Sequence, residues 1–318
     1  MSATYKATGI NLKCSPIGES DRLLTVLTKE HGLIRAVAPG ARKHQSTLRG
    51  RSGLFVVNQL LIVKGRSLDK IIQAESIENF VGLSQDLKKL TTGQYLAELV
   101  LCQALSDQPQ DELFTLLTEG LRRVETLSHT VTLPCLIHTT YHLLLLAGLE
   151  PRVHVCCLSQ EPLLPNFAVP QWQVGFSAEA GGTVKLSQSD RPVLKKTSTS
   201  RVGLESGNTD AESPSPIKRR VVEQAPPYVA AQATRRPDPL MMLNARELAL
   251  FQSLAQPDLI QPDGTLALDP EALPAVPSDK LWLTIERILR HYAQYHFERP
   301  IRSATLIDTC FQPYPSCP

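Results

Sequence analysis

The sequence predicts an α+β protein of several domains, in which an N-terminal β-barrel is followed by an α-helical domain. Three observations predict this class. Five short runs of apolar and β-branched residues fall within the first 80 positions. Apolar residues then recur at helical spacing as far as residue 149. A polar stretch rich in Ser, Thr and Pro separates these helices from a second helical region near the C-terminus.

The predicted strands cover residues 5–13, 22–28, 33–38, 55–63 and 68–80. Glu30-His31-Gly32 joins the second and third of them as a short hairpin connection. Five short strands in so few residues favour a closed barrel, because closure leaves no exposed sheet edge. The connection from Pro39 to Gly53 is unusual, since it is long, polar and basic.

Helical periodicity begins after the predicted barrel. A first helix lies between Leu87 and Leu105, a second is expected to be capped by Asp111, and a third covers 132–146 with Gly148 as its stop. Residues 150–184 look irregular, and 185–240 read as a disordered insertion. Helices are expected again at 244–255 and 279–297. The predicted units are 1–80, 81–150, 151–184, 185–240 and 241–318, with the last packing on the helical domain.

Composition excludes several classes of protein. Hydrophobic residues make up 42% and charged residues 20%, and 33 basic against 31 acidic side chains leave a net charge of +2. This balance excludes a wholly disordered chain and a polybasic tail protein. No apolar run reaches the ~18–20 residues that span a bilayer, and the first residues lack the apolar segment of a signal peptide. We therefore expect a cytoplasmic protein. Its seven scattered cysteines form no disulfide framework.

The small net charge conceals large regional differences. Between Arg35 and Lys70 there are eight basic side chains and one acid, a net charge of +7. Residues 81–150 carry four basic and eight acidic side chains, and 151–318 are neutral. Cations that neutralise phosphates release counterions, so such a cluster predicts salt-sensitive binding of nucleic acid. Aromatic side chains are scarce here, which favours contacts to the backbone over base recognition.

No motif predicts catalysis. The chain has no phosphate-binding glycine loop and no nucleophile elbow. His138 and His142 share one helix face without a third ligand, and Cys156-Cys157 with His154 lacks a second cysteine pair. We expect a protein that is not an enzyme and that holds no cofactor or metal.

Several segments resemble the RecO recombination-mediator family over about 240 residues. They are Gly18-Glu19-Ser20-Asp21-Arg22, 27–35, 38–43, 46–50, Tyr95-Leu96-Ala97-Glu98-Leu99, 112–117, 147–151 and 299–303. The resemblance implies that the barrel is an OB-fold and that the protein acts in DNA repair and recombination. It implies binding of single- and double-stranded DNA, strand annealing, and a nucleoid-associated location. The implied partners are RecR and the acidic tail of single-stranded DNA-binding protein (SSB), with loading of RecA as the outcome.

The family's basic loop positions correspond here to Arg35, Arg42, Lys43, Arg49 and Arg51. Charge alone adds Lys64 and Arg66 to these predicted DNA-binding residues.

The chain departs from the family's pattern in two ways. Many members have a four-cysteine zinc site, but here Gly181-Gly182 is followed by Thr, Val and Lys, so we expect a degenerate, zinc-knuckle-like segment without metal. The arginine-rich start of the third helix is also missing, which leaves Arg122 and Arg123 as weak candidates for binding the SSB tail.

Two other functions remain open from the sequence. The chain could be a protein-interaction adaptor whose acidic helical domain is the partner surface, or an RNA-binding OB-fold module. Phosphate contacts alone do not distinguish DNA from RNA.

Overall fold

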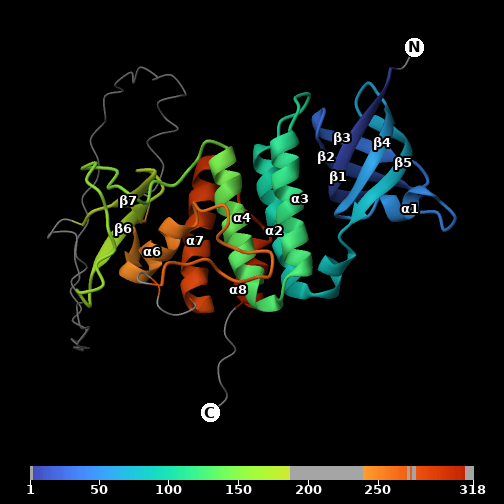
Figure 1. Cartoon of the computed structure of the whole chain (residues 1–318). Helices are drawn as coiled ribbons and strands as arrows, with labels where there is room; N and C mark the ends of the chain where they lie inside the picture. Colours follow the sequence, from blue (N-terminus) through green and yellow to red (C-terminus); the bar gives the residue numbers. More distant parts are fainter. Residues whose placement is uncertain (1–2, 187–238, 271–272, 274–276, 312–318) are drawn as a thin grey trace, which may run out of the picture. The chain divides into compact units, whose positions relative to one another are not determined.

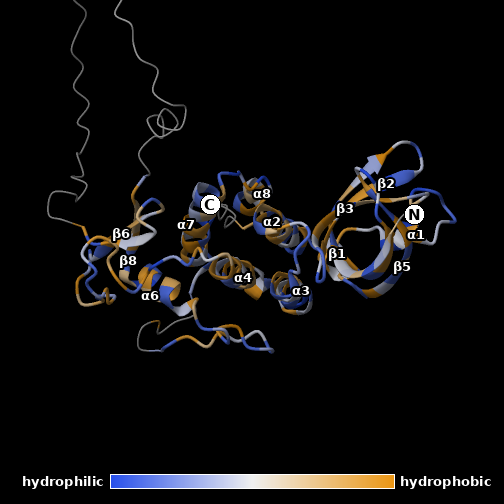
Figure 2. Cartoon of the chain, turned by 90° about the horizontal axis from the view of Figure 1, so that it is seen from above, coloured by the Kyte–Doolittle hydropathy of each residue, from blue (hydrophilic) through white to orange (hydrophobic). Residues whose placement is uncertain are grey.

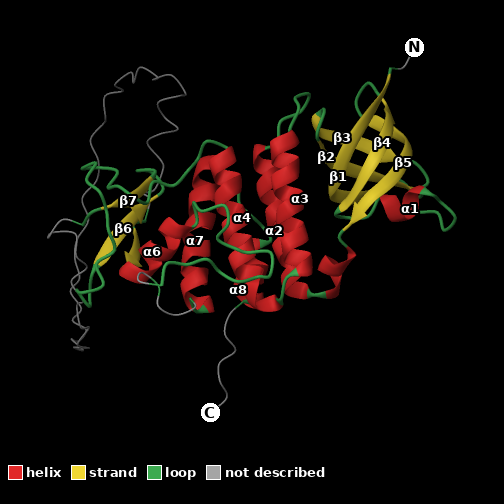
Figure 3. Cartoon of the chain, in the orientation of Figure 1, coloured by secondary structure: helices red, strands yellow, loops and turns green. Residues whose placement is uncertain are grey.

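The computed structural model describes residues 3–186, 239–270, 273 and 277–311. Residues 1–185 and 240–318 form one compact unit (Figure 1). Of the predicted insertion at 185–240, all but residues 185, 186, 239 and 240 lie outside the described residues. Figure 3 shows strands and helices in separate groups, so the prediction of an α+β protein is confirmed.

The first five strands form a closed barrel. They are β1 (Thr4–Ile17), β2 (Asp21–Thr28), β3 (Gly32–Ala38), β4 (Val56–Val63) and β5 (Asp69–Asn79), in the order β1-β2-β3-β5-β4. Neighbouring strands are antiparallel except for β3 and β5, which pair in parallel. All five predicted strands are present. A short helix, α1 (Leu48–Arg51), was not predicted and lies in the long connection between β3 and β4.

Apolar side chains that alternate along the strands point inward and fill the barrel. Ala7, Leu24, Ile34, Leu60 and Ile71 belong to a cluster of buried side chains inside it. Their neighbours in sequence point to the outer surface, because successive side chains of a strand alternate between faces. Which residues reach solvent on each strand is therefore set by the strand register.

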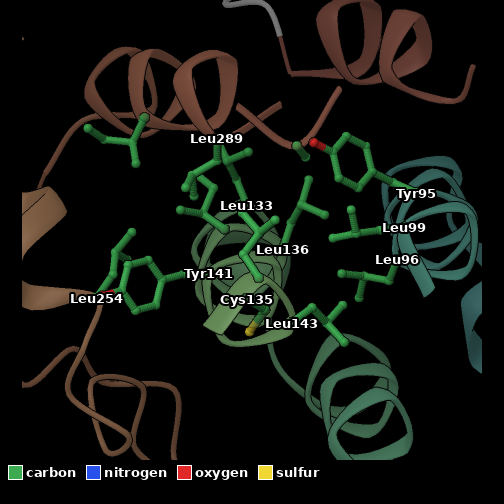
Figure 4. Packing of buried hydrophobic residues seen from close by; sticks show 14 of the residues in the cluster. Tyr95, Leu96, Leu99, Leu133, Cys135, Leu136, Tyr141, Leu143, Leu254 and Leu289 are labelled. Atoms are coloured by element: carbon green, nitrogen blue, oxygen red, sulfur yellow. The ribbon is translucent and has the colours of Figure 1, made fainter. Parts of the chain in front are cut away.

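Helices follow the barrel. The 3-10 helix η1 (Val81–Gln85) leads into α2 (Leu87–Gln103), α3 (Asp111–Thr126), the 3-10 helix η2 (His129–Val131) and α4 (Thr132–Leu146). Helix α4 is buried along most of its length, and Leu133, Leu136 and Tyr141 lie among side chains of several other elements (Figure 4). Gly148, at φ +72°, ends α4 as expected.

The predicted cap of α3 is wrong by one position. Gln110 is the N-cap and makes no side-chain capping bond, whereas Asp111 is the first helical residue. There its carboxylate lies 3.1 Å from Lys29 Nζ of the barrel. An acid in the first turn is still favourable, because it faces the positive end of the helix dipole.

The barrel and the helices share one hydrophobic core. Phe55 of the barrel is buried beside Gly93 of α2, where an added Cβ would lie 3.1 Å from the Phe55 ring. The backbone of Phe55 has φ +59°, in the left-handed region that residues with a side chain rarely adopt. A glycine at position 93 therefore provides the space in which the ring packs against the helix.

The segment at 150–184, expected to be irregular, contains two strands. Strands β6 (Gln173–Ser177) and β7 (Gly182–Val184) join β8 (Met241–Asn244) in a sheet of order β7-β6-β8. The expectation was wrong because the strands are very short, and β8 comes from a distant part of the sequence. Helices α6 (Ala245–Ser253) and α7 (Asp279–Phe297) confirm the predicted ones, whereas α8 (Ala304–Cys310) was not predicted.

Helix α7 is amphipathic and is joined to α8 by charged side chains, of which Glu286 is buried and Asp308 is half-buried. Figure 2 shows hydrophilic and hydrophobic sides on α7. Arg290 of α7 donates to Glu286 at 2.6 Å and to both oxygens of Asp308 on α8 at 2.8 Å. Ser303 donates to Glu98 of α2 at 3.1 Å. In the described parts of the chain, no helix is long and apolar enough to cross a membrane.

Candidate nucleic-acid interface

Three connections surround the outer surface of β2 and β3. The β1–β2 turn pairs Ile17 with Asp21, the β3–β4 connection starts after Ala38 opposite Arg22, and β5 begins with Asp69 opposite Ala36. The β1–β2 and β4–β5 connections of small barrels of this topology, together with the strands between them, are a common nucleic-acid binding surface. We call this surface the basic face and define it by the exposed cations that its strands and connections carry: Lys13, Arg35, Arg42, Lys43, Arg49, Arg66 and Lys70.

The first part of the β3–β4 connection is fixed to the β1–β2 turn. The backbone N–H of Arg42 donates to Ser20 O at 2.8 Å, and its guanidinium donates to Gly18 O at 3.1 Å. Asp21 accepts the N–H of Gly40 at 2.8 Å. The pKa of Asp21 is lowered, first by this bond, then by the Ser20 hydroxyl and by the nearby charges of Lys43 and Lys70. The two lysines, from different elements, are therefore both close to this carboxylate.

The second part of the connection is held by buried amides. Asn11 Nδ2 donates to the carbonyls of Arg51 and Gly53 at 2.9 and 2.8 Å, and Asn58 Nδ2 donates to Arg51 O at 2.9 Å. Both asparagine side chains are fully buried in the barrel wall. These bonds fix the backbone around α1, so that the chain is ordered before any ligand binds.

Arg22 fixes the same connection from β2. Its guanidinium donates to Arg49 O at 3.3 Å and to Ser52 Oγ at 2.9 Å. The side chain of Arg49 is exposed. Arg22 thus holds the backbone of the connection, and the side chain of Arg49 is left on the surface.

Two lysines on the strands complete the basic face. Register places Lys13 opposite Thr25 and Thr25 opposite Arg35, so these residues form a row across β1, β2 and β3. Lys70 extends the adjacent row, opposite Val37. Side chains directly opposite each other lie ~5 Å apart. Neither Lys13 nor Lys70 is among the predicted DNA-binding residues. The β-bulge between Asn11 and Lys13 places Lys13 on the outer face, and alternation with the buried Ile71 places Lys70 there.

The seven predicted DNA-binding residues are not equivalent in the structure. Arg35, Arg42, Lys43, Arg49 and Arg66 are exposed on the basic face. Arg51 is half-buried, and its guanidinium donates to Thr47 O at 3.4 Å. Lys64 is exposed in the β4–β5 connection, and its Nζ lies 3.8 Å from the carboxylate of Asp107. DNA contact by these residues stays a prediction.

Aromatic side chains are absent from the two rows of the basic face. Leu23 and Val37, both half-buried, lie between Ser15 and Lys70 in one row. A hollow of about 530 Å³ within the β3–β4 connection is lined by Lys43 and His44. The two strand rows offer cations and aliphatic groups but no ring on which a base would stack, so they are suited to phosphates.

The cysteines of the 150–185 segment do not form a metal site. Cys156 Sγ accepts N–H bonds from Ser159 at 3.4 Å and Lys185 at 3.2 Å. Burial raises the pKa of this thiol, but the N–H donors outweigh burial and bring it to about 7. Thr183, in the position after the glycines, donates to the carbonyls of Arg152 and Val155. Across the described residues, no group of three or more His, Cys, Asp or Glu could hold a metal ion. The side chains present therefore do not fit a zinc ion.

Of the two histidines of α4, His138 is buried against the loop that follows α6, and His142 is half-buried beside it. His138 Nε2 lies 2.9 Å from Gln256 O and 3.0 Å from His142 Nε2. Burial lowers the pKa of both, and that of His138 falls to about 4. His138 is therefore a neutral core residue at physiological pH.

Comparison with known proteins agrees with this geometry. Residues 1–80 match the family model "Recombination protein O N terminal", and 84–209 match "Recombination protein O C terminal". The chain is 50% identical over 316 residues to a protein of Nostoc sp. (strain PCC 7120), covering 98% of this chain and 97% of that protein. Identity is 50% to a protein of Acaryochloris marina and 38% to one of Synechococcus elongatus, with at least 96% of each chain covered. All three relatives are named DNA repair protein RecO.

Proposed function

Because the chain belongs to the RecO family of DNA repair proteins, we propose that it binds single- and double-stranded DNA through the basic face and promotes annealing of complementary strands. The observation that carries the proposal is the anchored β3–β4 connection, which presents Arg42, Lys43 and Arg49 beside Arg35 and Lys70. The backbone of this connection is already ordered by Asn11, Asn58 and Arg22. Binding therefore requires little further ordering of the protein.

The mechanism is electrostatic. Cations of the basic face neutralise phosphates of a bound strand, which lowers its repulsion for a second strand. Since no aromatic ring of the two strand rows stacks on bases, the bases stay available for pairing. Nothing in this mechanism requires bond chemistry, and we propose a role without enzymatic activity. Binding to chromosomal DNA in this way would place the protein at the nucleoid.

The partners follow from the family. We propose that the protein acts with RecR to load RecA onto DNA coated by SSB, and that it contacts the acidic tail of SSB. Arg122, one weak candidate for that tail, donates through two nitrogens to both oxygens of Glu78 at 2.9–3.0 Å. An acidic tail would have to displace Glu78 to use Arg122. Arg123 is half-buried.

The 150–185 segment would support the fold without metal. We propose that the N–H bonds to Cys156 Sγ and the Thr183 hydroxyl bonds replace a bound zinc as the interactions that close this segment. The segment then corresponds to a degenerate knuckle.

The test is charge reversal on the basic face. The variant Arg42→Glu/Lys43→Glu/Arg49→Glu is compared with the unmodified chain in binding labelled single-stranded and duplex DNA over a salt series. Each lost phosphate contact is expected to lower the slope of log affinity against log salt by ~0.7 for single strands and ~0.9 for duplex. Strand annealing, with and without SSB, should weaken in parallel.

The matched control reverses three exposed cations of the helical region. Arg246→Glu/Lys280→Glu/Arg302→Glu changes the net charge equally, away from the barrel. Only the barrel variant is expected to lose DNA affinity and to show a smaller slope of log affinity against log salt. Equal losses in both variants, or none in either, would contradict the proposal. Competition with RNA of the same sequence tests the RNA-binding alternative.

A further inference from the structure

Strand β5 contains two β-bulges, and the extra residue in each is an isoleucine. Ile62 of β4 pairs with Ile71 and Leu61 with Gln73, so Ile72 has no partner in the ladder. Asn58 pairs with Ser76 and Val57 with Glu78, so Ile77 has none either. Ile72 is 52% exposed and Ile77 is 60% exposed. Bulges re-aim side chains, and here both direct a large apolar group into solvent.

Ile77 stands at the edge of a hollow between β5 and α3. The hollow has a volume of about 350 Å³, and Thr8, Phe114, Thr115 and Thr118 line it together with Ile77. Phe114 is buried and Ile77 is exposed, so the hollow offers an apolar wall that a protruding side chain can cover. Exposed apolar surface of this kind beside a hollow is typical of protein contacts.

The cations of this surface are already neutralised. Lys29 lies 3.1 Å from Asp111, and Arg122 is bonded to Glu78. Two exposed acids are left: Glu119 in the hollow and Glu75 on β5 between the isoleucines. Within the described part of the chain, neither lies within 4.0 Å of a cation. Around Glu75 and Ile77 the surface is therefore apolar and acidic, whereas the exposed Lys70 of the basic face lies two residues before Ile72.

We propose that Ile72, Ile77 and the hollow beside α3 form a docking surface for a protein segment in which apolar side chains are flanked by Lys or Arg. An apolar side chain of the partner covers Ile77 and enters the hollow, while its cations pair with Glu75 and Glu119. Glu75 and Glu119 make the surface around Ile77 unfavourable for phosphate, so the docking of this segment does not depend on the proposed function.

The experiment uses the full chain and two labelled synthetic peptides, one alternating Lys with Ile and the other alternating Glu with Ile. Fluorescence anisotropy should detect binding of the Lys peptide and none of the Glu peptide. The variant Ile72→Ser/Ile77→Ser should weaken binding of the Lys peptide at least tenfold, although its charge is unchanged. Equal binding of the Lys and Glu peptides would overturn the proposal. Equal binding of the Lys peptide by the unmodified chain and by Ile72→Ser/Ile77→Ser would also overturn it, as would the absence of any peptide binding.

A matched control removes the same number of apolar carbon atoms elsewhere, from side chains that are more exposed than the isoleucines. Leu158→Ser/Leu164→Ser alters two side chains that are 74% and 79% exposed, and it should leave peptide binding unchanged. Because all four side chains are already exposed, the variants are expected to fold, and circular dichroism checks this. DNA affinity should be the same in both variants. Its loss in Ile72→Ser/Ile77→Ser would place the isoleucines in the DNA interface and overturn the proposal.

Discussion

Replacing Asn11 by Leu separates the ordering of the basic face from its charge. The Asn11 amide donates two bonds, to the carbonyls of Arg51 and Gly53. Leucine has a similar size and no donor, so the variant Asn11→Leu keeps every cation and releases the β3–β4 connection. A change in DNA binding would then report the loss of order rather than the loss of charge.

The magnitude follows from the two bonds. Each contributes about 0.5–1.5 kcal/mol net, so the pair contributes about 2 kcal/mol. Asn58 still donates to Arg51 O, which limits the loss at that carbonyl. Asn11 Oδ1 has no hydrogen-bond partner, so its removal costs nothing. A loss of about 2 kcal/mol corresponds to amide exchange ~30-fold faster in the connection, if exchange there occurs by local opening.

Hydrogen exchange and DNA binding are the two assays. Hydrogen exchange reports on individual amides of the barrel. Tryptophan fluorescence would not, because both tryptophans, Trp172 and Trp282, lie outside the barrel. Amides of 39–55 should exchange faster in Asn11→Leu, and DNA affinity should fall about tenfold because binding must now order the connection. The salt slope should be unchanged, since the same phosphates are contacted. The control Gln59→Leu alters an exposed amide of β4.

Two results would refute this reasoning. Unchanged affinity with faster exchange would mean that the order of the connection is irrelevant to binding. A smaller salt slope would mean that Asn11 determines how many phosphates are contacted, and not only the cost of contacting them.

Three further predictions concern the helical region and the cysteines. Arg290→Met leaves the buried Glu286 without its partner and should lower the free energy of unfolding by about 3–5 kcal/mol in urea titrations; adding Glu286→Gln and Asp308→Asn should restore part of it. Burial holds the pKa of His138 near 4, below its unfolded value of about 6.5, so protonation favours the unfolded chain between these values. The contribution of His138 to stability should be full above pH 6.5 and fall towards pH 4. The variant His138→Gln should flatten this fall in thermal melts. Chelators should leave the melting temperature unchanged, since Cys156 is held by N–H donors, and a lower melting temperature would show a bound metal.

Sequence periodicity predicted the elements that bury a continuous face. Helices α2, α3 and α4 and the five barrel strands are long enough for a period to be counted. Strand β7 has three residues, and β6 is paired with β8 from a distant part of the chain, so no local pattern marks them. Helix α8 is short and is fixed by the ion pair of Asp308 with Arg290, a tertiary contact that local sequence does not encode.

The candidate site was predictable in charge and not in arrangement. Cations of the connections could be counted from the sequence, because a polar, basic loop is exposed wherever it lies. The row of Lys13 and Arg35 depends on a register that contains a β-bulge between Asn11 and Lys13. The pairing of Lys64 with Asp107 depends on the α2–α3 connection lying beside the barrel. Both need the tertiary fold.

The acids of the barrel explain why the basic face remains basic. Asp69, the single acid between Arg35 and Lys70, accepts the Tyr5 hydroxyl and the N–H of Gly65 at 3.0 Å. Asp21 likewise accepts the N–H of Gly40. Each carboxylate orders a connection that carries cations, and neither is fully exposed. Asp21 and Asp69 thus fix the backbone at the edges of the face, and the exposed Glu19 lies in the β1–β2 turn, two residues before Asp21. The two aspartates hold the connections in the geometry that presents the more numerous cations.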